Sequence, residues 1–175
     1  YKYPETSVGW YRKTISIPAS DFGKHLYLQF DGIFRDARIW VNGFFLGEEP
    51  SGYVTQVYDI TDYLNYGGEN LVVVRVDASL EEGWFYEGAG IYRHVWVNKT
   101  APVHVAPFGT FVSSDLSASL DEAKVSVQTT VVNDGIKEGT YRLNHLLKTA
   151  DGRVIASVGN EEQPLQAKAQ SVSTI

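Results

Sequence analysis

Residues 30–49 read FDGIFRDARIWVNGFFLGEE, and this stretch decides the fold. Within it Ala37, Ile39 and Val41 recur at every second position, which is the period of a strand with one buried face. Asn42-Gly43 follows directly, and this pair tolerates the positive φ angles that a type I′ two-residue turn requires. The stretch therefore predicts a β-hairpin whose two strands are joined at Asn42-Gly43.

The same alternation extends through the rest of the chain, whereas helical periodicity is nearly absent. Asp151-Gly152 predicts a second hairpin turn, between 143–149 and 154–158. One short helical turn, capped by Thr61, is expected within 59–64. Many short strands with frequent turns are typical of a β-sandwich or jelly roll, so we predict an all-β protein. The apolar strand faces that support this are Leu26, Leu28 and Phe30; Val72, Val74 and Val76; and Val125, Val127, Thr129 and Val131.

The aromatic residues divide the sequence into two parts. All 4 Trp and ten of the 11 Tyr precede residue 107, and Pro107 and Gly109 mark the change. A core rich in large aromatic side chains can form only in the first part. We therefore predict a jelly-roll domain at 1–106 and a second β-sandwich domain at 107–175.

Composition excludes several classes of function. The net charge is −6 and no run of Lys or Arg occurs, so a nucleic-acid partner is not expected. No apolar stretch approaches the roughly 18 residues that a membrane-spanning helix needs. The chain has 0 Cys, which excludes disulfides, thiolate zinc sites and a thiol nucleophile.

We also expect no metal and no cofactor. The 4 His are scattered, without a metal-ligand neighbour two or four positions away. Gly88-x-Gly90 is not followed by a predicted helix, so a nucleotide phosphate site is not indicated. Asp31, Asp36 and Asp59 could contribute to a calcium site, but no oxygen-rich loop accompanies them.

Five consecutive segments resemble the sugar-binding domain of glycoside hydrolase family 2. Each segment alone is weak evidence, but their order over about a hundred residues is specific. This chain departs from the family pattern at the start of the last segment. Many members carry Arg immediately before a Trp-Tyr pair, whereas this chain has Trp84-Phe85-Tyr86. The version found here is most similar to bacterial β-galactosidase-like members. The segments are 9–18 (GWYRKTISIP), 30–37 (FDGIFRDA), 40–47 (WVNGFFLG), 53–70 and 84–96 (WFYEGAGIYRHVW).

The resemblance implies a galactose-binding-like jelly roll followed by part of an immunoglobulin-like sandwich, whose first long hairpin is similar to 125–135. It also implies a retaining β-glycosidase, of β-galactosidase type, as the parent protein. In this family a (β/α)₈ barrel carries the two catalytic Glu, and no such pattern occurs in 1–175. The chain starts without Met and ends inside an alternating stretch, so we expect a truncated, non-catalytic portion of a longer enzyme.

The resemblance further implies that a loop of the first domain reaches the sugar site of the barrel. Aromatic rings stack on the apolar faces of sugars, and carboxylates accept hydrogen bonds from hydroxyl groups. The expected substrate-binding residues are Glu81, Glu82, Trp84, Phe85 and Tyr86. An equally open interpretation is that these residues form a solvated loop that caps the sandwich. Structural support is expected from Asp36, Glu87 and Arg93, with the Arg93 guanidinium pairing with Asp36 or Glu87.

Two rival functions stay open. The chain could be an independent carbohydrate-binding module, or a purely structural domain that orients or oligomerises the parent enzyme. The expected partners are a carbohydrate substrate, the barrel domain and, less specifically, further copies of the parent in a homo-oligomer. For location, the resemblance favours a periplasmic or secreted protein over a cytoplasmic one.

Overall fold

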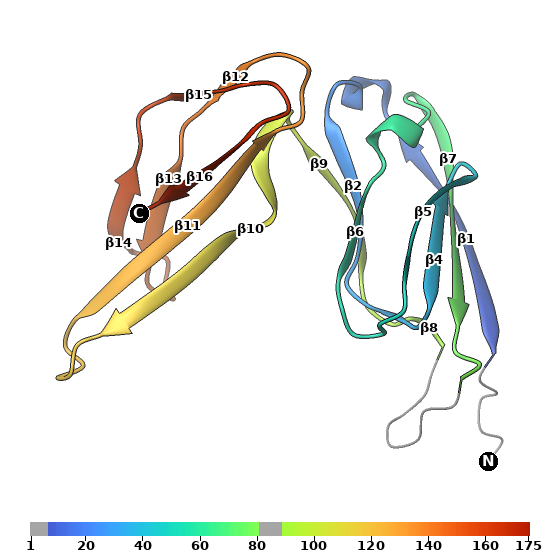
Figure 1. The fold of residues 1–175 in the computed structure, drawn as a ribbon, viewed down its shortest axis with the longest axis horizontal. Helices are drawn as coiled ribbons and strands as arrows, with labels where there is room; N and C mark the ends of the chain where they lie inside the picture. Colours follow the sequence, from blue (N-terminus) through green and yellow to red (C-terminus); the bar gives the residue numbers. More distant parts are fainter. Residues whose placement is uncertain (1–6, 81–88) are drawn as a thin grey trace. The chain divides into compact units, whose positions relative to one another are not determined.

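The protein consists of antiparallel β-sheets arranged in two units (Figure 1). The structure, a computed structural model, describes residues 7–80 and 89–175. Unit 1 is Tyr1–Lys99 and unit 2 is Thr100–Ile175. The helices in the described ranges are two single 3₁₀ turns, and none of them is long and apolar enough to cross a membrane. The prediction of an all-β fold is therefore confirmed. The two turns are η1 (Ala19–Asp21) and η2 (Thr61–Tyr63).

Unit 1 is a sandwich of two sheets with a short extra ladder. The order is β1-β7-β4-β5 in one sheet and β6-β2-β9 in the other. A two-stranded ladder, β3-β8, is separate from both sheets, and its strand β8 follows the segment 81–88. The strands are β1 (Val8–Ile17), β2 (His25–Phe30), β3 (Ile33–Phe34), β4 (Ala37–Val41), β5 (Phe44–Glu49), β6 (Gln56–Asp59), β7 (Gly68–Asp77), β8 (Gly90–Ile91) and β9 (Val95–Thr100).

The core of unit 1 is built from the alternating faces that the sequence predicts. Alternate residues of β2, β4 and β7 are buried, and the apolar side chains among them belong to one cluster. Because strand side chains alternate between the two faces of a sheet, the intervening residues of β1, β4 and β7 lie on the outer face. The buried cluster is Ile17, Leu26, Leu28, Phe30, Ile33, Ala37, Ile39, Val41, Ile60, Val72, Val74 and Val76.

The predicted hairpin between β4 and β5 is confirmed. Asn42 has φ 51° and Gly43 has φ 86°, as a type I′ turn requires. Asn42 also joins the turn to the neighbouring strand, because its Oδ1 accepts a 2.8 Å hydrogen bond from Leu71 N. Its Nδ2 donates to Tyr63 O at 2.7 Å and to Asn70 Oδ1 at 2.8 Å. The residue therefore has a tertiary role that its turn propensity does not indicate.

The expected helical turn at 59–64 is also present, as η2, but its cap differs. Thr61 was expected to cap the turn; instead its N and Oγ1 both donate to Asp59 Oδ1, at 2.9 Å and 2.6 Å. An Asp side chain two residues earlier can accept both hydrogen bonds because it folds back over the turn. Thr61 Oγ1 in turn accepts a hydrogen bond from Leu26 N, which ties η2 to β2.

Unit 2 contains a three-stranded sheet, β10-β11-β16, and two short hairpin sheets, β12-β15 and β13-β14. The second predicted hairpin is confirmed, with Gly152 at φ 88°. The buried apolar residues of unit 2 are Val131 and Leu165, a much smaller set than in unit 1. The strands are β10 (Val103–Leu116), β11 (Ala123–Asn133), β12 (Gly139–Tyr141), β13 (Asn144–Lys148), β14 (Val154–Gly159), β15 (Gln163–Leu165) and β16 (Gln170–Thr174).

The two units divide a few residues before the boundary that composition suggested. Position 106 falls inside β10, which continues to Leu116. The pairing of β10 with β11 shifts register between Val105 and Thr110, and Phe108 has φ 55°. Pro107 and Gly109 therefore mark a bulge within one strand, since such residues interrupt a ladder as readily as they end a domain.

Candidate functional site at the loop end of unit 1

The predicted sugar-binding residues fall in a segment outside the described residues, namely Glu81, Glu82, Trp84, Phe85 and Tyr86, together with the supporting Glu87. The structure does describe what precedes and follows this segment. It leaves β7 through Asp77 and Ser79 and re-enters the fold at β8. The geometry of these two attachment points determines where the segment begins and ends.

The attachment at β8 is fixed by backbone pairing and by one tyrosine. β8 pairs with β3, placing Phe34 opposite Gly90. Tyr92 N donates to Gly32 O at 3.3 Å, and Tyr92 Oη donates to Gly52 O at 2.8 Å. A Cβ on Gly32 would lie 2.5 Å from Tyr92 Cζ, so only glycine allows the ring to pass at this distance. Tyr92 thus clamps three segments together at the end of the sandwich.

The attachment at β7 is fixed by the carboxylate of Asp77. Its Oδ1 accepts hydrogen bonds from Ser79 N at 3.1 Å and from Ser79 Oγ at 2.6 Å. Its Oδ2 accepts from Arg75 Nη2 at 2.7 Å, and its backbone N donates to Arg35 O at 3.0 Å. The hydrogen bonds from Ser79, followed by that from Arg75, lower the pKa of Asp77 to about 2. Asp77 is therefore an ionised structural group at neutral pH.

Asp36 and Arg93 are the predicted supporting residues that the structure describes. Asp36 Oδ2 lies 3.0 Å from Arg35 Nε, so the partner of this carboxylate is its sequence neighbour. Arg93 lies close to Asp31, and its charge helps to lower the pKa of that carboxyl, after larger effects of hydrogen bonds from Gln29 and Trp96. The expected Arg93–Asp36 pair is thus replaced by Arg35–Asp36. The alternative pair, Arg93 with Glu87, involves a residue outside the described ranges.

Several residues at this end were missed as functional candidates by reasoning from the sequence. Phe34 and Tyr53 meet edge to face at 5.6 Å between ring centroids. Gly52 lies beneath Phe34, where a Cβ would come within 2.2 Å of the ring. Trp96 Nε1 donates to Asp31 Oδ2 at 2.9 Å, across 65 positions of sequence. The sequence signal that could have indicated these residues is their place within the family-like segments. Local patterns, however, do not reveal such long-range contacts.

Asp31 and Asp77 are poorly suited to act as a general acid. A general acid in a glycosidase needs a raised pKa, whereas the pKa of both Asp31 and Asp77 is lowered. The described ranges contain no group of three His, Cys, Asp or Glu that could hold a metal ion. Asp31, Asp36 and Asp59 are instead engaged with Trp96, Arg35 and Thr61.

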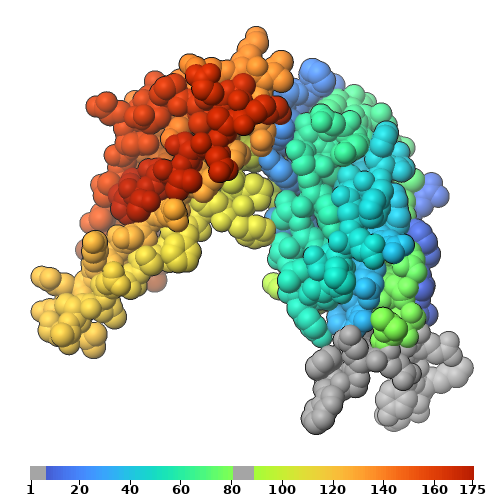
Figure 2. Space-filling view, in the orientation of Figure 1, coloured from blue at the N-terminus to red at the C-terminus, as the bar shows by residue number. Residues whose placement is uncertain are grey.

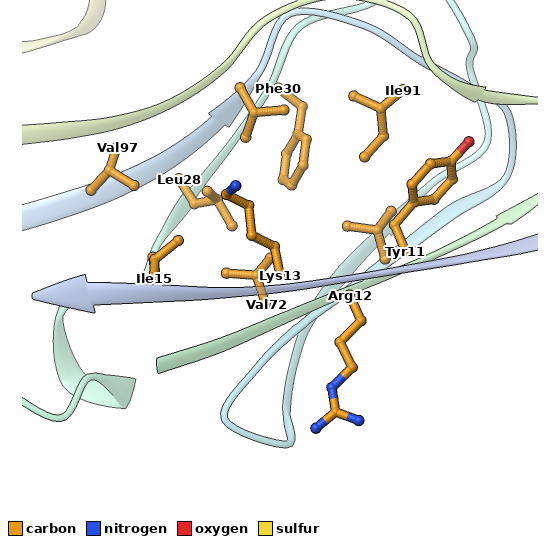
Figure 3. Close-up of a pocket in the computed structure, with 11 residues that line it drawn as sticks. Tyr11, Arg12, Lys13, Ile15, Leu28, Phe30, Val72, Ile91 and Val97 are labelled. Atoms are coloured by element: carbon orange, nitrogen blue, oxygen red, sulfur yellow. The ribbon is translucent and has the colours of Figure 1, made fainter. Parts of the chain in front are cut away.

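Unit 1 also has an apolar groove between its two sheets, with a volume of about 390 Å³ (Figure 3). Tyr11, Ile15, Leu28 and Phe30 face into it, whereas Arg12 points away from the other labelled side chains. Sugars need several hydrogen-bonding partners, and this lining supplies few. The groove is therefore an extension of the core and a weak candidate for a sugar site.

Comparison of this chain with known proteins identifies its family. Residues 3–101 match the family model described as glycosyl hydrolases family 2, sugar binding domain. A β-galactosidase of Bacteroides ovatus is 40% identical over 152 residues, which are 85% of this chain and 18% of that protein. A solved family 2 member from Bacteroides cellulosilyticus superposes with a TM-score of 0.89 at 34% identity, covering 97% of this chain and 23% of the other.

A β-glucuronidase of Bacteroides uniformis superposes with a TM-score of 0.88 at 26% identity, over 97% of this chain and 21% of that one. The chain thus spans less than a quarter of the length of these relatives. The match to the family model covers more than half of the chain and coincides with unit 1. The chain therefore belongs to glycosyl hydrolase family 2 and contains the sugar-binding domain of that family.

Proposed function

We propose that this chain is the non-catalytic front portion of a retaining β-galactosidase of family 2. The catalytic carboxylates then belong to a barrel domain elsewhere in the full-length protein. In this role unit 1 presents the segment 81–88 to the terminal sugar, with Trp84, Phe85 and Tyr86 shaping the wall of the pocket. Glu81 or Glu82 accepts a hydrogen bond from a sugar hydroxyl.

The observation that carries this proposal is the set of hydrogen bonds that hold the described residues on both sides of the segment 81–88. The chain before it is held by the Asp77 turn, and the chain after it is held by the β3-β8 ladder and by Tyr92. A loop that positions ligand-binding side chains needs such support, because small displacements of a binding group reduce its effect strongly. A loop that only caps the sandwich needs no comparable anchoring.

The choice of galactose rests on sequence similarity. The B. ovatus β-galactosidase is 40% identical over 152 residues, slightly more than a putative β-glucuronidase of Formosa agariphila, which is 36% identical over 156 residues. A glucuronide carries a carboxylate, for which a site normally supplies a cationic side chain. The segment 81–88 contains three Glu and no Lys or Arg, which favours a neutral sugar at this segment.

The test is a substrate panel on the full-length protein. Nitrophenyl β-galactoside, β-glucuronide, β-mannoside and β-glucoside are compared by kcat/KM, and the anomeric configuration of the first product is followed by NMR. We expect preference for the β-galactoside, retention of configuration, and no hydrolysis by residues 1–175 alone. A preference for the glucuronide, or inversion of configuration, would overturn the corresponding part of the proposal.

A further inference from the structure

The outer face of the sheet β1-β7-β4-β5 carries a cluster of aromatic rings that the proposed function does not use. Trp10 and Trp40 stack with centroids 5.7 Å apart and planes inclined by 26°. Trp40 also contacts Phe45, at 5.5 Å between centroids. Trp10 is 63% exposed and Phe45 is 54% exposed. We call these three residues the aromatic platform.

Strand register explains how the platform forms. Trp40 lies opposite Phe45 on β5 and opposite Val73 on β7. Trp10 lies on β1, so its ring reaches across β7 to meet Trp40. Since neighbouring strands are about 4.8 Å apart, the platform extends over about 14 Å from β1 to β5. It is an extended surface, wider than a single sugar ring, on the face opposite the core.

A polar pocket of about 170 Å³ adjoins the platform. Arg75 is the register partner of both Trp10 and Arg38, so Trp10 shares a rung with these pocket residues. Trp40 and Phe45 lie opposite each other on the next outward-facing rung. Arg38 forms a two-point pair with Glu48, at 3.0 Å and 3.2 Å. In the space-filling view the cyan atoms of β5 lie beside the light green atoms at the end of β7 (Figure 2). The pocket is lined by Asp36, Arg38, Glu48, Arg75, Asp77, Ser79 and Leu80.

We propose that this face is a carbohydrate-binding surface for a neutral glycan chain. The apolar C–H faces of successive sugar rings stack on the platform, as aromatic rings in proteins favour. The sugar hydroxyls accept hydrogen bonds from the guanidinium groups of Arg38 and Arg75. They donate to the carboxylates of Glu48 and Asp77. The aromatic platform can contact the apolar faces of a sugar ring, and the neighbouring ion pairs can form hydrogen bonds with the hydroxyl groups at its edges.

The charges argue against a protein as the occupant of this face. The centre of a protein interface is depleted in charged residues, because ion pairs buried there lose their hydration. Here the side chains of Arg38 and Glu48 are 45% and 43% exposed. They lie on the same rung of the sheet as Trp10, and Trp40 lies on the next rung that faces outward. A hydrated sugar exchanges hydrogen bonds with such groups while they stay in contact with water.

The test measures retardation of the 1–175 chain in native gels that contain soluble β-1,4-galactan, hydroxyethylcellulose or galactomannan. We expect at least one of these neutral polysaccharides to retard the chain. Trp10→Ala and Phe45→Ala should each weaken that retardation about tenfold, which is the size of effect that loss of one stacked ring produces. Arg38→Ala should weaken it as well, with little change in stability, because an exposed ion pair contributes little to folding.

Phe22→Ala is the matched control, since Phe22 is a 79% exposed aromatic residue of the same unit outside this face. It should bind as the parent chain does, and thermal unfolding confirms that each variant is folded. Absence of retardation by all three polysaccharides overturns the proposal, as does unchanged binding by Trp10→Ala and Phe45→Ala. Self-association that Trp10→Ala abolishes, without sugar binding, would instead make this face an interface between copies.

This inference does not depend on the proposed enzymatic role. It concerns residues of β1, β4, β5 and β7 and is measured on the chain alone, whereas the enzymatic role concerns 81–88 and is measured on the full-length protein. Either can fail while the other holds.

Discussion

At the scale of single residues, the loop end of unit 1 depends on glycines that give room to aromatic rings. Gly32 lies against Tyr92, and an added methyl group at this position would lie 2.5 Å from the ring. We expect Gly32→Ala to reduce the free energy of unfolding by about 1–3 kcal/mol, because the ring must move and its hydrogen bond to Gly52 is strained. The measurement is urea unfolding followed by tryptophan fluorescence. Gly9→Ala is the control, since the nearest atom to its Cβ is 3.7 Å away and no clash arises. Equal losses in both variants would contradict this packing argument.

Asp77 gives the clearest dependence on pH. Its pKa in the folded protein is about 2, below the roughly 3.9 of an unfolded Asp. Its contribution to stability is therefore complete above pH 4 and is lost as the pH falls through 4 towards 2. We expect Asp77→Asn to lower the melting temperature at pH 7, with a difference from the parent chain that shrinks below pH 4. Asp62→Asn, at an exposed position of the same unit, should show a smaller difference at pH 7. A gap between Asp77→Asn and the parent that is independent of pH would contradict the assignment.

At the scale of elements, the β4-β5 hairpin allows two roles of Asn42 to be distinguished: its tolerance of positive φ in the turn and its side-chain hydrogen bonds to other elements. Asn42→Gly keeps a residue that tolerates positive φ but removes the three side-chain hydrogen bonds to Leu71, Tyr63 and Asn70. If Asn42 served only the turn, this substitution would be nearly neutral. We expect instead a loss of about 1–3 kcal/mol in the free energy of unfolding, because the buried Asn70 loses a partner. Chemical denaturation decides between the two, and a loss below about 0.5 kcal/mol supports the turn alone.

The elements also show how far the sequence could predict the structure. Alternation located the buried faces of β2, β4 and β7, because burial on one face of a strand imposes a period of two. It could not locate the bulge near Phe108, since Pro and Gly mark a bulge and a boundary equally well. The contact of Tyr92 with Gly52 was likewise not predictable, because it depends on long-range packing. Asp36 pairs with its sequence neighbour Arg35, and the charge pattern alone does not distinguish this partner from Arg93. The aromatic platform is visible only once register brings Trp10, Trp40 and Phe45 together.

At the scale of the whole molecule, the two units differ in how much apolar surface they bury. Unit 1 has a cluster of twelve buried residues, whereas the buried apolar residues of unit 2 are Val131 and Leu165. Burial of apolar surface is the main source of stability, so unit 2 should open more readily. We expect hydrogen exchange to be slowest in β2, β4 and β7 and at least tenfold faster in β13 and β14. Uniform protection across both units would show that they unfold as one.

The central claim is that the chain supplies sugar-binding side chains to a catalytic domain that lies elsewhere in the full-length protein. The most direct test is the kinetics of Glu82→Ala in that protein, with Glu161→Ala in unit 2 as the control. We predict that kcat/KM for nitrophenyl β-galactoside falls about tenfold or more in Glu82→Ala, the effect of losing a charged hydrogen bond to the sugar, and is unchanged in the control. If Glu82→Ala left both kcat and KM at their parent values, the claim that Glu82 binds the sugar would be contradicted.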